Sequence, residues 1–426
     1  MSYFPRYATD KTLEYIFTFE FKIAQFIKIE ASWLARISKF VGLTQKDIDD
    51  VYLTEISVEE FLEKEKETNH DIAALIKCLV AKLKDNPAAK FIHIGLTSND
   101  INDTILGLQM LVINDTIYKK LNVLYNILKT KTWDHKNVLC CGRTHGQVAT
   151  IMTYGQRFAS WFFELQPIMH KFDKTYAYGK LAGAVGNYSA IKYVVQCTDR
   201  YCEEIELDVL NDIHPRLFPA LSKTQVVTRT YLSDLIYNLI VAASVCGKIC
   251  HQIRHLSRTE INEINEEFKS TSIGSSAMPH KQNPVRSERV CGIVKTLQPM
   301  MITALMNIDL ADERDISNSS SERIMIENVA RLTDFVVSET SDILTNMYIN
   351  YYQISANVTN HRREMLSELR MTRMTMTGLD RQSAYDLVKN NSGDKEDDFS
   401  NDLFTYLEYG FDPSSIEPNV PPSQQQ

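Results

Sequence analysis

The sequence predicts an all-α fold, and three observations support this prediction. Glycine and proline are sparse, with 15 Gly and 12 Pro in 426 residues. Apolar residues recur at helical spacing through most of the chain, and few segments show the alternation of strands. Hydrophobic residues make up 44% and charged residues 23% of the chain, as in an ordinary globular protein. This length is sufficient for two or three domains.

Residues 1–96 are predicted to form an N-terminal domain of medium-length helices. One helix is expected to open at residues 44–45, and residues 57–60 have a capping pattern that opens another. His70 and Asp71 open an apolar helix. There Asp71 either orients the imidazole of His70 or simply favours the helix start.

Residues 97–350 are predicted to form a central domain of long helices. Apolar residues recur at helical spacing over four runs, 102–131, 150–178, 230–265 and 319–350. Pro167 is expected to kink the second run, whereas the third has no proline and would be about 50 Å long if continuous. Such helices bury their apolar faces in a bundle. Apolar coverage on several sides predicts oligomerisation, although a monomeric bundle would show the same pattern.

Residues 351–426 are predicted to form a small C-terminal helical domain. The stretch 371–378 alternates Met and Thr with few apolar neighbours, and a short helix is expected near 383–388. The tail from 412 onward is rich in Pro, Ser and Gln, a composition typical of disorder.

Composition and missing motifs exclude several classes of function. The net charge of −8 argues against general nucleic-acid binding, which needs a basic surface. The eight cysteines include no CxxC pair, so we expect reduced thiols in a cytoplasmic protein rather than a zinc ribbon. We find no signal peptide, no apolar stretch of membrane-spanning length, no P-loop and no dinucleotide-binding fingerprint.

The segment Gly274–Pro284, in a predicted loop over residues 270–284, has the composition of an anion-binding loop. Small residues let the backbone approach a ligand closely and expose its N–H groups, and Ser275 and Ser276 add two hydroxyls. Lys281 and Asn283 supply a cation and an amide. These groups suit a site with a nucleophile or base. The alternative is a serine-rich linker that contains a lysine.

Two further segments carry candidate chemistry near predicted helix starts. His145, within 143–147, precedes a predicted long helix and titrates near neutrality, so it is either an acid–base group or a helix cap. Thr97 and Ser98 precede another long helix, where N–H groups favour a carboxylate or phosphate, although plain N-capping explains them equally. His93 lies four residues before Thr97.

The remaining candidates are cationic or imidazole groups. Arg314, Ser319 and Arg323 suit a phosphate, and Arg286 and Arg289 add positive charge beyond the loop, although surface salt bridges would use arginines in the same way. His251 and His255 have metal-ligand spacing but no nearby third ligand. We therefore interpret them as polar positions of the bundle.

Taken in order, these segments resemble the fumarase/aspartase superfamily, whose members eliminate fumarate from a substituted succinate. Within it, the chain is similar to the branch that acts on succinylated purine nucleotides. The resemblance runs to about Asn350 and rests on Arg6–Tyr7, His70–Asp71, Gly95–Ser98, Arg143–Gln147, Ala182–Tyr188, Thr224–Gln225, Gly274–Pro284 and Glu313–Arg323. It departs from that branch at Leu310–Asp312, which lacks the usual Trp, at Lys223, which replaces Ser, and in its short C-terminal domain.

The resemblance implies three all-α domains, with central long helices forming the core of a homotetramer whose active sites are shared among three subunits. The substrate would be a small molecule, a succinylated purine nucleotide or its succinyl-carboxamide imidazole ribotide precursor. No metal and no organic cofactor is expected, and neither nucleic acid nor membrane is an expected partner. The alternatives are another fumarate-releasing lyase, acting on argininosuccinate or a carboxymuconate, and a catalytically silent structural relative.

The resemblance also implies individual roles. Ser275 would be the base and His145 the acid that protonates the leaving nitrogen. Lys281, Asn283 and the Thr97–Ser98 pair would stabilise the charge that develops on the carboxylate. The other implied substrate-binding residues are Arg6, Tyr7, His70, Asp71, His93, Gln225, Ser276, Met278, Arg289, Arg314, Ser319 and Arg323.

Overall fold

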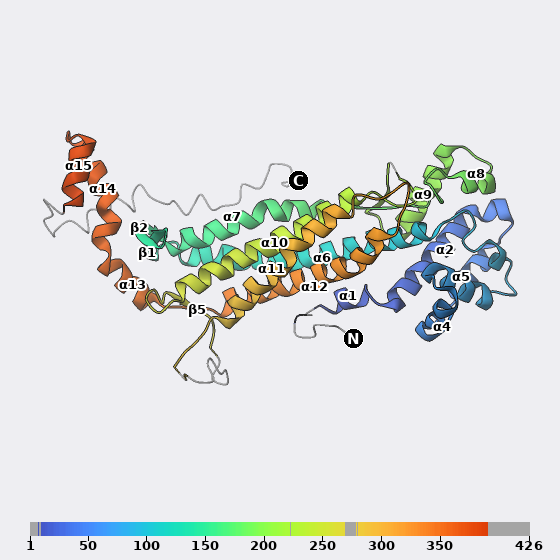
Figure 1. Cartoon of the computed structure of the whole chain (residues 1–426), viewed down its shortest axis with the longest axis horizontal. Coiled ribbons are helices and arrows are strands. Elements are labelled where there is room, and N and C mark those ends of the chain that lie inside the picture. The colour runs from blue at the N-terminus through green and yellow to red at the C-terminus, as the bar shows by residue number, and fades with distance from the viewer. Residues whose placement is uncertain (1–6, 8–9, 222, 269–277, 279, 391–426) are drawn as a thin grey trace. The chain divides into compact units, whose positions relative to one another are not determined.

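The computed structural model describes residues 7, 10–221, 223–268, 278 and 280–390, and most of them are helical (Figure 1). The all-α prediction is therefore confirmed. The helices are α1 (Lys11–Tyr15), α2 (Phe19–Val41), α3 (Gln45–Tyr52), α4 (Val58–Thr68), α5 (Asp71–Lys82), α6 (Ser98–Asp134), α7 (Tyr154–Asp173), α8 (Ser189–Val195), α9 (Asp199–Ile213), α10 (Arg229–Leu256), α11 (Val285–Met306), α12 (Ser317–Asn346), α13 (Tyr351–Asn360), α14 (Arg362–Met376) and α15 (Arg381–Lys389), with a short 3₁₀ helix at Pro87–Phe91.

Within the described part of the chain, three small two-stranded sheets interrupt the helices. The antiparallel pair β1 (Leu139–Thr144) and β2 (Gln147–Thr153) forms a hairpin. The parallel pair is β3 (Ala177–Gly179) with β4 (Leu217–Pro219). In the third sheet β5 (Ile264–Asn265) runs antiparallel to β6 (Tyr348–Ile349), which joins the segment before the predicted loop to the segment after α12.

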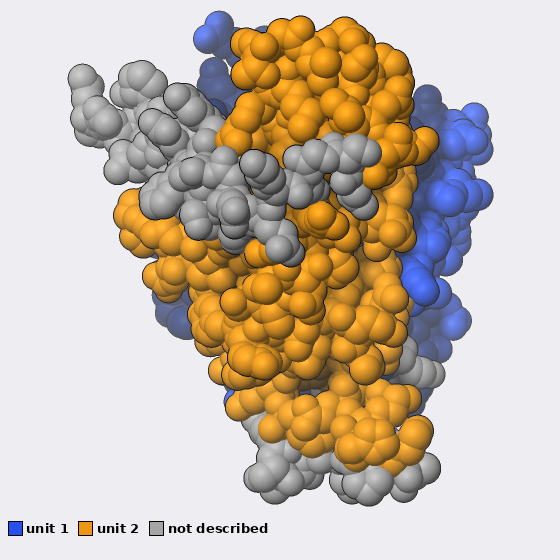
Figure 2. Space-filling view, turned by 90° about the vertical axis from the view of Figure 1, so that its left-hand side faces the viewer, with its two compact units in different colours: residues 1–121, 168–244, 293–338 blue, residues 122–167, 245–292, 339–426 orange. Residues whose placement is uncertain are grey.

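The chain divides into two compact units, coloured separately in Figure 2. Unit 1 comprises residues 1–121, 168–244 and 293–338, and unit 2 comprises residues 122–167, 245–292 and 339–426. The helices α6, α7, α10, α11 and α12 each have residues in both units. The three-domain boundaries inferred from the sequence stay a prediction.

Unit 1 contains the N-terminal helices and part of the long bundle. Thr44 and Ser57 form the capping boxes of α3 and α4 at the two predicted starts. The indole N–H of Trp33, on the buried face of α2, donates to the carbonyl of Ile94 at 3.1 Å. Between long helices, the Ser233 hydroxyl of α10 donates to the Ala304 carbonyl of α11 at 3.0 Å. The Trp33 contact thus fixes the segment that precedes α6, and the Ser233 contact joins two long helices.

Unit 2 packs the remaining parts of the long helices against the hairpin and α13. The Trp161 indole of α7 donates to Gln252 of α10, and Cys250 of α10 lies 3.6 Å from the Thr340 hydroxyl of α12. The hairpin residues Cys141 and Ile151 form a buried cluster with Val358 of α13 and Met365 of α14. The hairpin is thus anchored through its apolar face.

Two predicted helical runs are shorter than expected. The run predicted over 150–178 begins as strand β2, and α7 starts only at Tyr154. His145 and Gly146 have φ of 54° and 78°, which is the backbone of a tight hairpin turn rather than of a helix start. Helix α10 ends at Leu256, before the left-handed Asn262, so the run to 265 is not one helix. Helix α7 continues through Pro167.

Helix α10 also differs from expectation in its hydropathy. By length and composition alone it qualifies as long and apolar enough to cross a membrane, although the sequence was interpreted as having no such stretch. Its most apolar window is 56% buried inside the chain. That degree of burial is also found in core helices of globular bundles.

Candidate active site

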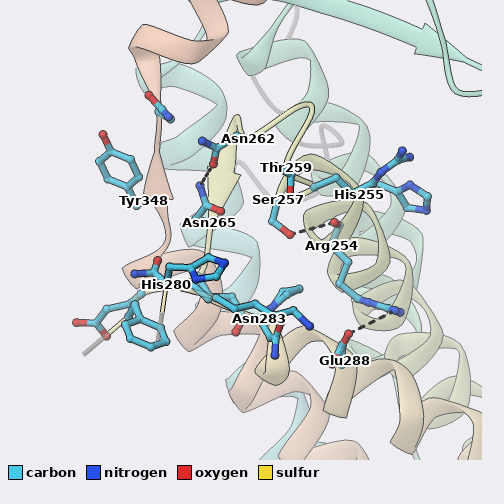
Figure 3. A pocket seen from close by; sticks show the side chains of 18 of the residues that line it. Arg254, His255, Ser257, Thr259, Asn262, Asn265, His280, Asn283, Glu288 and Tyr348 are labelled. Carbon is cyan, nitrogen blue, oxygen red and sulfur yellow. Dashed lines mark hydrogen bonds and ion pairs between the residues drawn. The ribbon is translucent and has the colours of Figure 1, made fainter. Parts of the chain in front are cut away.

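Unit 2 contains a large pocket that the loop segment borders (Figure 3). Its volume is about 1280 Å³, and it lies among the end of α10, the residues around β5 and β6, the described end of the loop and the start of α11. Met278, Lys281 and Asn283, three of the predicted substrate-binding residues, line this pocket. Ser275 and Ser276 lie outside the described residues.

Glu266 closes the base of the loop. Its carboxylate accepts the backbone N–H groups of Arg286 at 3.1 Å and Ser287 at 2.6 Å, in the first turn of α11. A carboxylate is favoured there because a helix N-terminus carries unpaired N–H groups and partial positive charge. The chain before the loop is therefore tied to the chain after it. The Lys281 N–H donates to the Met278 carbonyl at 3.0 Å, which forms a turn within the loop.

The pocket wall is rich in cationic and imidazole side chains, some of them paired. Arg254 lies 3.8 Å from Glu288, and Arg258 lies 3.6 Å from Glu260. His251 and His255 line the pocket with their Nε2 atoms 3.2 Å apart. Burial lowers the pKa of His255, and the neighbouring His251 lowers it further. The interpretation of these histidines as plain bundle positions was therefore incomplete, because they face a cavity.

His145 stands at the tip of the β1–β2 hairpin in unit 2. Its side chain is exposed, and its left-handed backbone is followed by Gly146, which tolerates positive φ without strain. It is not among the residues that line the 1280 Å³ pocket of the same chain. Arg143, two residues earlier, donates to Glu263 at 2.9 Å. The hairpin is thus linked to the chain just before β5.

In unit 1, the structure brings His70 and Ser98 together, two candidates that the sequence placed in separate motifs. The Nε2 atom of His70 lies 3.3 Å from the Ser98 hydroxyl, while its Nδ1 accepts the Ala73 N–H and caps α5. Asp71 pairs with Lys22 at 2.5 Å and lies 3.4 Å from Nδ1 of His70. Because Nδ1 accepts the Ala73 N–H, it has no proton to donate to Asp71, so this contact does not orient the imidazole. Asp71 lies in the first turn of α5, where a carboxylate favours the helix start. Sequence reasoning missed Lys22, since no motif surrounds it.

His93 is held by a buried carboxylate that the sequence did not single out. Glu30, 0% exposed, accepts from the His93 backbone N–H at 2.9 Å, and its other oxygen lies 2.7 Å from the His93 Nδ1. The backbone of His93 is left-handed, with φ of 61°. This double contact fixes both the ring and the backbone of His93. A glutamate within the apolar run of α2 was the only available signal.

A carboxylate of the chain itself, that of Asp100, accepts a hydrogen bond at the N-terminus of α6. Asp100 accepts the Thr97 N–H at 2.7 Å, so this N–H is used within the chain. The same carboxylate accepts the backbone N–H groups of Ala182 at 2.9 Å and Gly183 at 3.1 Å, and it pairs with Lys180 at 2.5 Å. The expected anion site at Thr97 and Ser98 therefore cannot use the Thr97 N–H.

Arg314, Ser319 and Arg323 lie on one side of unit 1. Arg314 donates to the Ser319 hydroxyl at 2.9 Å. Ser319 and Arg323 line a pocket of about 420 Å³ together with Lys22 and Asp71. Arg229, which is buried and also lines it, pairs with Asp103 and Glu322 in a buried triad.

The remaining predicted residues have structural partners of their own. Gln225 donates through its side chain to the Ala184 carbonyl at 3.2 Å and through its N–H to the Glu313 carbonyl at 3.3 Å. Gln225 thus contacts both Ala182–Tyr188 and Glu313–Arg323, two of the segments on which the resemblance rests. Arg289 lies 3.6 Å from Glu339. The Tyr7 ring packs edge-on against Phe335, and Arg6 lies outside the described residues.

Known lyases match most of this chain. A family model described as a lyase matches residues 40–297. The adenylosuccinate lyase of Methanocaldococcus jannaschii is 32% identical over 394 residues, which cover 90% of this chain and 82% of that protein. The adenylosuccinate lyase of Methanothermobacter thermautotrophicus is 33% identical over 394 residues, covering 90% and 85%.

Solved structures match over nearly the whole chain. The 3-carboxy-cis,cis-muconate lactonizing enzyme from Pseudomonas putida has a TM-score of 0.79 at 19% identity, covering 99% of this chain and 91% of that one. A fumarate lyase from Mesorhizobium has a TM-score of 0.78 at 16% identity, covering 96% and 93%. At such identities these neighbours support the fold alone.

The matching family model and the fold together define a lyase with the fumarase/aspartase architecture. Adenylosuccinate lyases are at least 30% identical to this chain and are matched over most of their length, and the chain belongs to that family.

Proposed function

We propose that this chain cleaves adenylosuccinate to AMP and fumarate, and the succinyl-carboxamide imidazole ribotide (SAICAR) to AICAR and fumarate. Identity above 30% to adenylosuccinate lyases over 90% of the chain carries the proposal. The pocket supports it, because Lys281 and Asn283 line a cavity of about 1280 Å³, which is large enough for a nucleotide. No observation favours argininosuccinate or a carboxymuconate as the substrate.

The proposed reaction is a β-elimination of nitrogen. Ser275 removes the proton from the carbon beside a carboxylate, and the electron pair of the broken C–H bond forms the new C=C bond. The C–N bond breaks, its electron pair stays on nitrogen, and His145 supplies the proton that nitrogen needs. Lys281 and Asn283 donate to the carboxylate on which negative charge develops.

The proposed nucleotide-binding groups come from several segments of the chain. Arg314, Ser319 and Arg323 bind the phosphate, an arrangement supported by the Arg314–Ser319 hydrogen bond of 2.9 Å. The remaining polar contacts are assigned to Arg6, Tyr7, His70, Asp71, His93, Thr97, Ser98, Gln225, Ser276, Met278 and Arg289. For Arg289 the proposal competes with its ion pair to Glu339.

We further propose a cytoplasmic homotetramer with shared active sites. The long helices of unit 1 expose large apolar side chains, among them Ile302 at 63%, Met306 at 71% and Ile324 at 68%. Exposed apolar faces of this kind are typical of association surfaces. Sharing would also supply His145 to the pocket of another copy. Sedimentation of the purified protein tests the assembly.

The activity is tested by following the ultraviolet absorbance of adenylosuccinate and detecting fumarate in the product. Ser275→Ala is expected to abolish the chemical step while keeping substrate affinity. His145→Ala is expected to lower kcat at least about 100-fold, the usual size of an acid–base contribution. Near-normal turnover of either variant would reject its assignment, and inactivity of the unmodified protein towards both purine substrates would reject the proposed function.

A further inference from the structure

Glu263 is the most fully bonded buried carboxylate of unit 2, and the elimination described above assigns it no role. It directly precedes β5, and its side chain is 0% exposed. Its Oε1 accepts from Arg143 at 2.9 Å and from the Asn357 amide at 2.8 Å, and its Oε2 accepts from the Tyr154 hydroxyl at 2.6 Å.

The backbone of Glu263 is fixed as well. Its N–H donates to the Leu256 carbonyl at the end of α10, at 2.9 Å. Its carbonyl accepts the Asn350 N–H, also at 2.9 Å. The side-chain and backbone hydrogen bonds together therefore fix Glu263 in one position, between the end of α10 and the start of α13. The predicted loop, residues 270–284, begins seven residues later.

Two of the side-chain partners lie in or directly beside the hairpin that carries His145. Arg143 is in β1, two residues before the hairpin tip, and Tyr154 is the first residue of α7, directly after β2. One carboxylate thus binds strand β1 and the residue at which β2 leaves the hairpin. Burial raises the pKa of Tyr154 well above its ordinary value, and the Glu263 charge raises it further, so the phenol remains a donor.

The charge of Glu263 is costly to bury, which argues for a purpose beyond filling space. A buried carboxylate is stable only where donors surround it, and apolar residues of similar volume commonly give equal or better stability. What a carboxylate adds is direction, because charge-assisted hydrogen bonds are short and geometrically strict. Here such a hydrogen bond aligns the segment of Arg143 with the segment of Glu263, which is 120 residues away in the sequence.

We propose that Glu263 is a positioning residue for the elimination: through Arg143 and Tyr154 it fixes the hairpin tip with His145 in the same frame as the loop with Lys281. This inference rests on the proposed function. Where active sites are shared between copies, the two groups serve different sites, and Glu263 acts by fixing the hairpin tip with His145 within its own chain. It does not touch the substrate.

The first test is Glu263→Gln, which keeps the shape and removes the charge. We expect kcat to fall about 10- to 100-fold with KM changed less than about threefold, because misplacement of an acid–base group weakens the chemical step rather than binding. Arg143→Lys keeps the charge but loses the guanidinium geometry, and we expect the same pattern. If Glu263→Gln does not fold, Arg143→Lys still tests the proposal.

The matched control is Asp334→Asn. Asp334 is also a buried carboxylate, 1% exposed and paired with Lys120 in unit 1, so its loss destabilises the protein without touching the hairpin. We expect its kcat to stay within about twofold of the unmodified protein. An equal loss of kcat in Asp334→Asn would overturn the proposal, since general destabilisation would then explain both variants.

The decisive measurement is a double-mutant cycle with His145→Ala. If Glu263 acts through His145, then Glu263→Gln in that background lowers kcat by less than about twofold, because the group it positions is already absent. A full multiplicative loss would overturn the proposal. Failure of the proposed function itself would show earlier and separately, as an unmodified protein without activity on adenylosuccinate.

Discussion

Replacing Lys180 tests how unit 1 holds its predicted substrate-binding segments. Lys180 and Asp100 are both 0% exposed, and their ion pair measures 2.5 Å. The ammonium also donates to the Gly183 carbonyl at 3.2 Å. Lys180→Met keeps the apolar stem and removes the charge, so Asp100 is left with its backbone donors alone.

The expected magnitude follows from these contacts. Removing one partner of a buried ion pair costs about 3–5 kcal/mol, because the remaining charge is uncompensated. Three backbone N–H groups still bind Asp100, from Thr97, Ala182 and Gly183, which favours the lower end of that range. The lost hydrogen bond to Gly183 adds about 1 kcal/mol. We therefore expect a loss of about 3–4 kcal/mol in the free energy of unfolding.

Urea denaturation followed by circular dichroism measures this loss. The control is Arg200→Ala, which removes an 88% exposed side chain paired with Glu204 at 3.5 Å and is expected to cost less than about 0.5 kcal/mol. A loss below about 1 kcal/mol for Lys180→Met, or one equal to that of the control, would refute the reasoning that this pair organises the segments around Asp100.

Three further predictions concern pH, backbone and chemistry. Burial raises the pKa of Asp71, but the Lys22 ammonium outweighs this effect and the net pKa lies below its ordinary value. The ionised Asp71 therefore stabilises the fold above about pH 4, and this stabilisation is lost as the pH falls through the lowered pKa. The loss of unfolding free energy that Asp71→Asn causes, measured in urea, should therefore shrink below about pH 4. A loss that stays constant with pH would contradict this prediction. Gly186→Ala places a Cβ 2.4 Å from the Lys223 carbonyl at φ +75°, whereas Gly42→Ala, at φ +73°, meets nothing within 4 Å. We expect Gly186→Ala to be less stable than Gly42→Ala by about 1–3 kcal/mol in urea, and equal losses would argue against this close contact. Lys281→Met should lower kcat about 100- to 1000-fold without changing the urea midpoint, because the side chain is exposed; a near-normal kcat would remove Lys281 from the mechanism.

The sequence alone predicted the helical class, the long helices and the order of the candidate segments. Helical periodicity and capping are local properties, so the starts of α3 and α4 at Thr44 and Ser57 were expected and observed. The order of motifs pointed to the superfamily, and the family comparisons confirmed it. Both His70 and Ser98 were candidates because each belongs to a motif in that order, but their contact is visible only in the structure.

Only the tertiary structure decided which charged groups support these segments. The hairpin at His145 depends on two successive left-handed residues and on Glu263. The base of the loop depends on Glu266, whose carboxylate binds N–H groups at the start of α11. Glu30 at His93 and Lys180 at Asp100 are further examples. The physical reason is that periodicity reports which face of a helix is buried, whereas the partner of a buried charge is set by packing between residues tens to hundreds of positions apart.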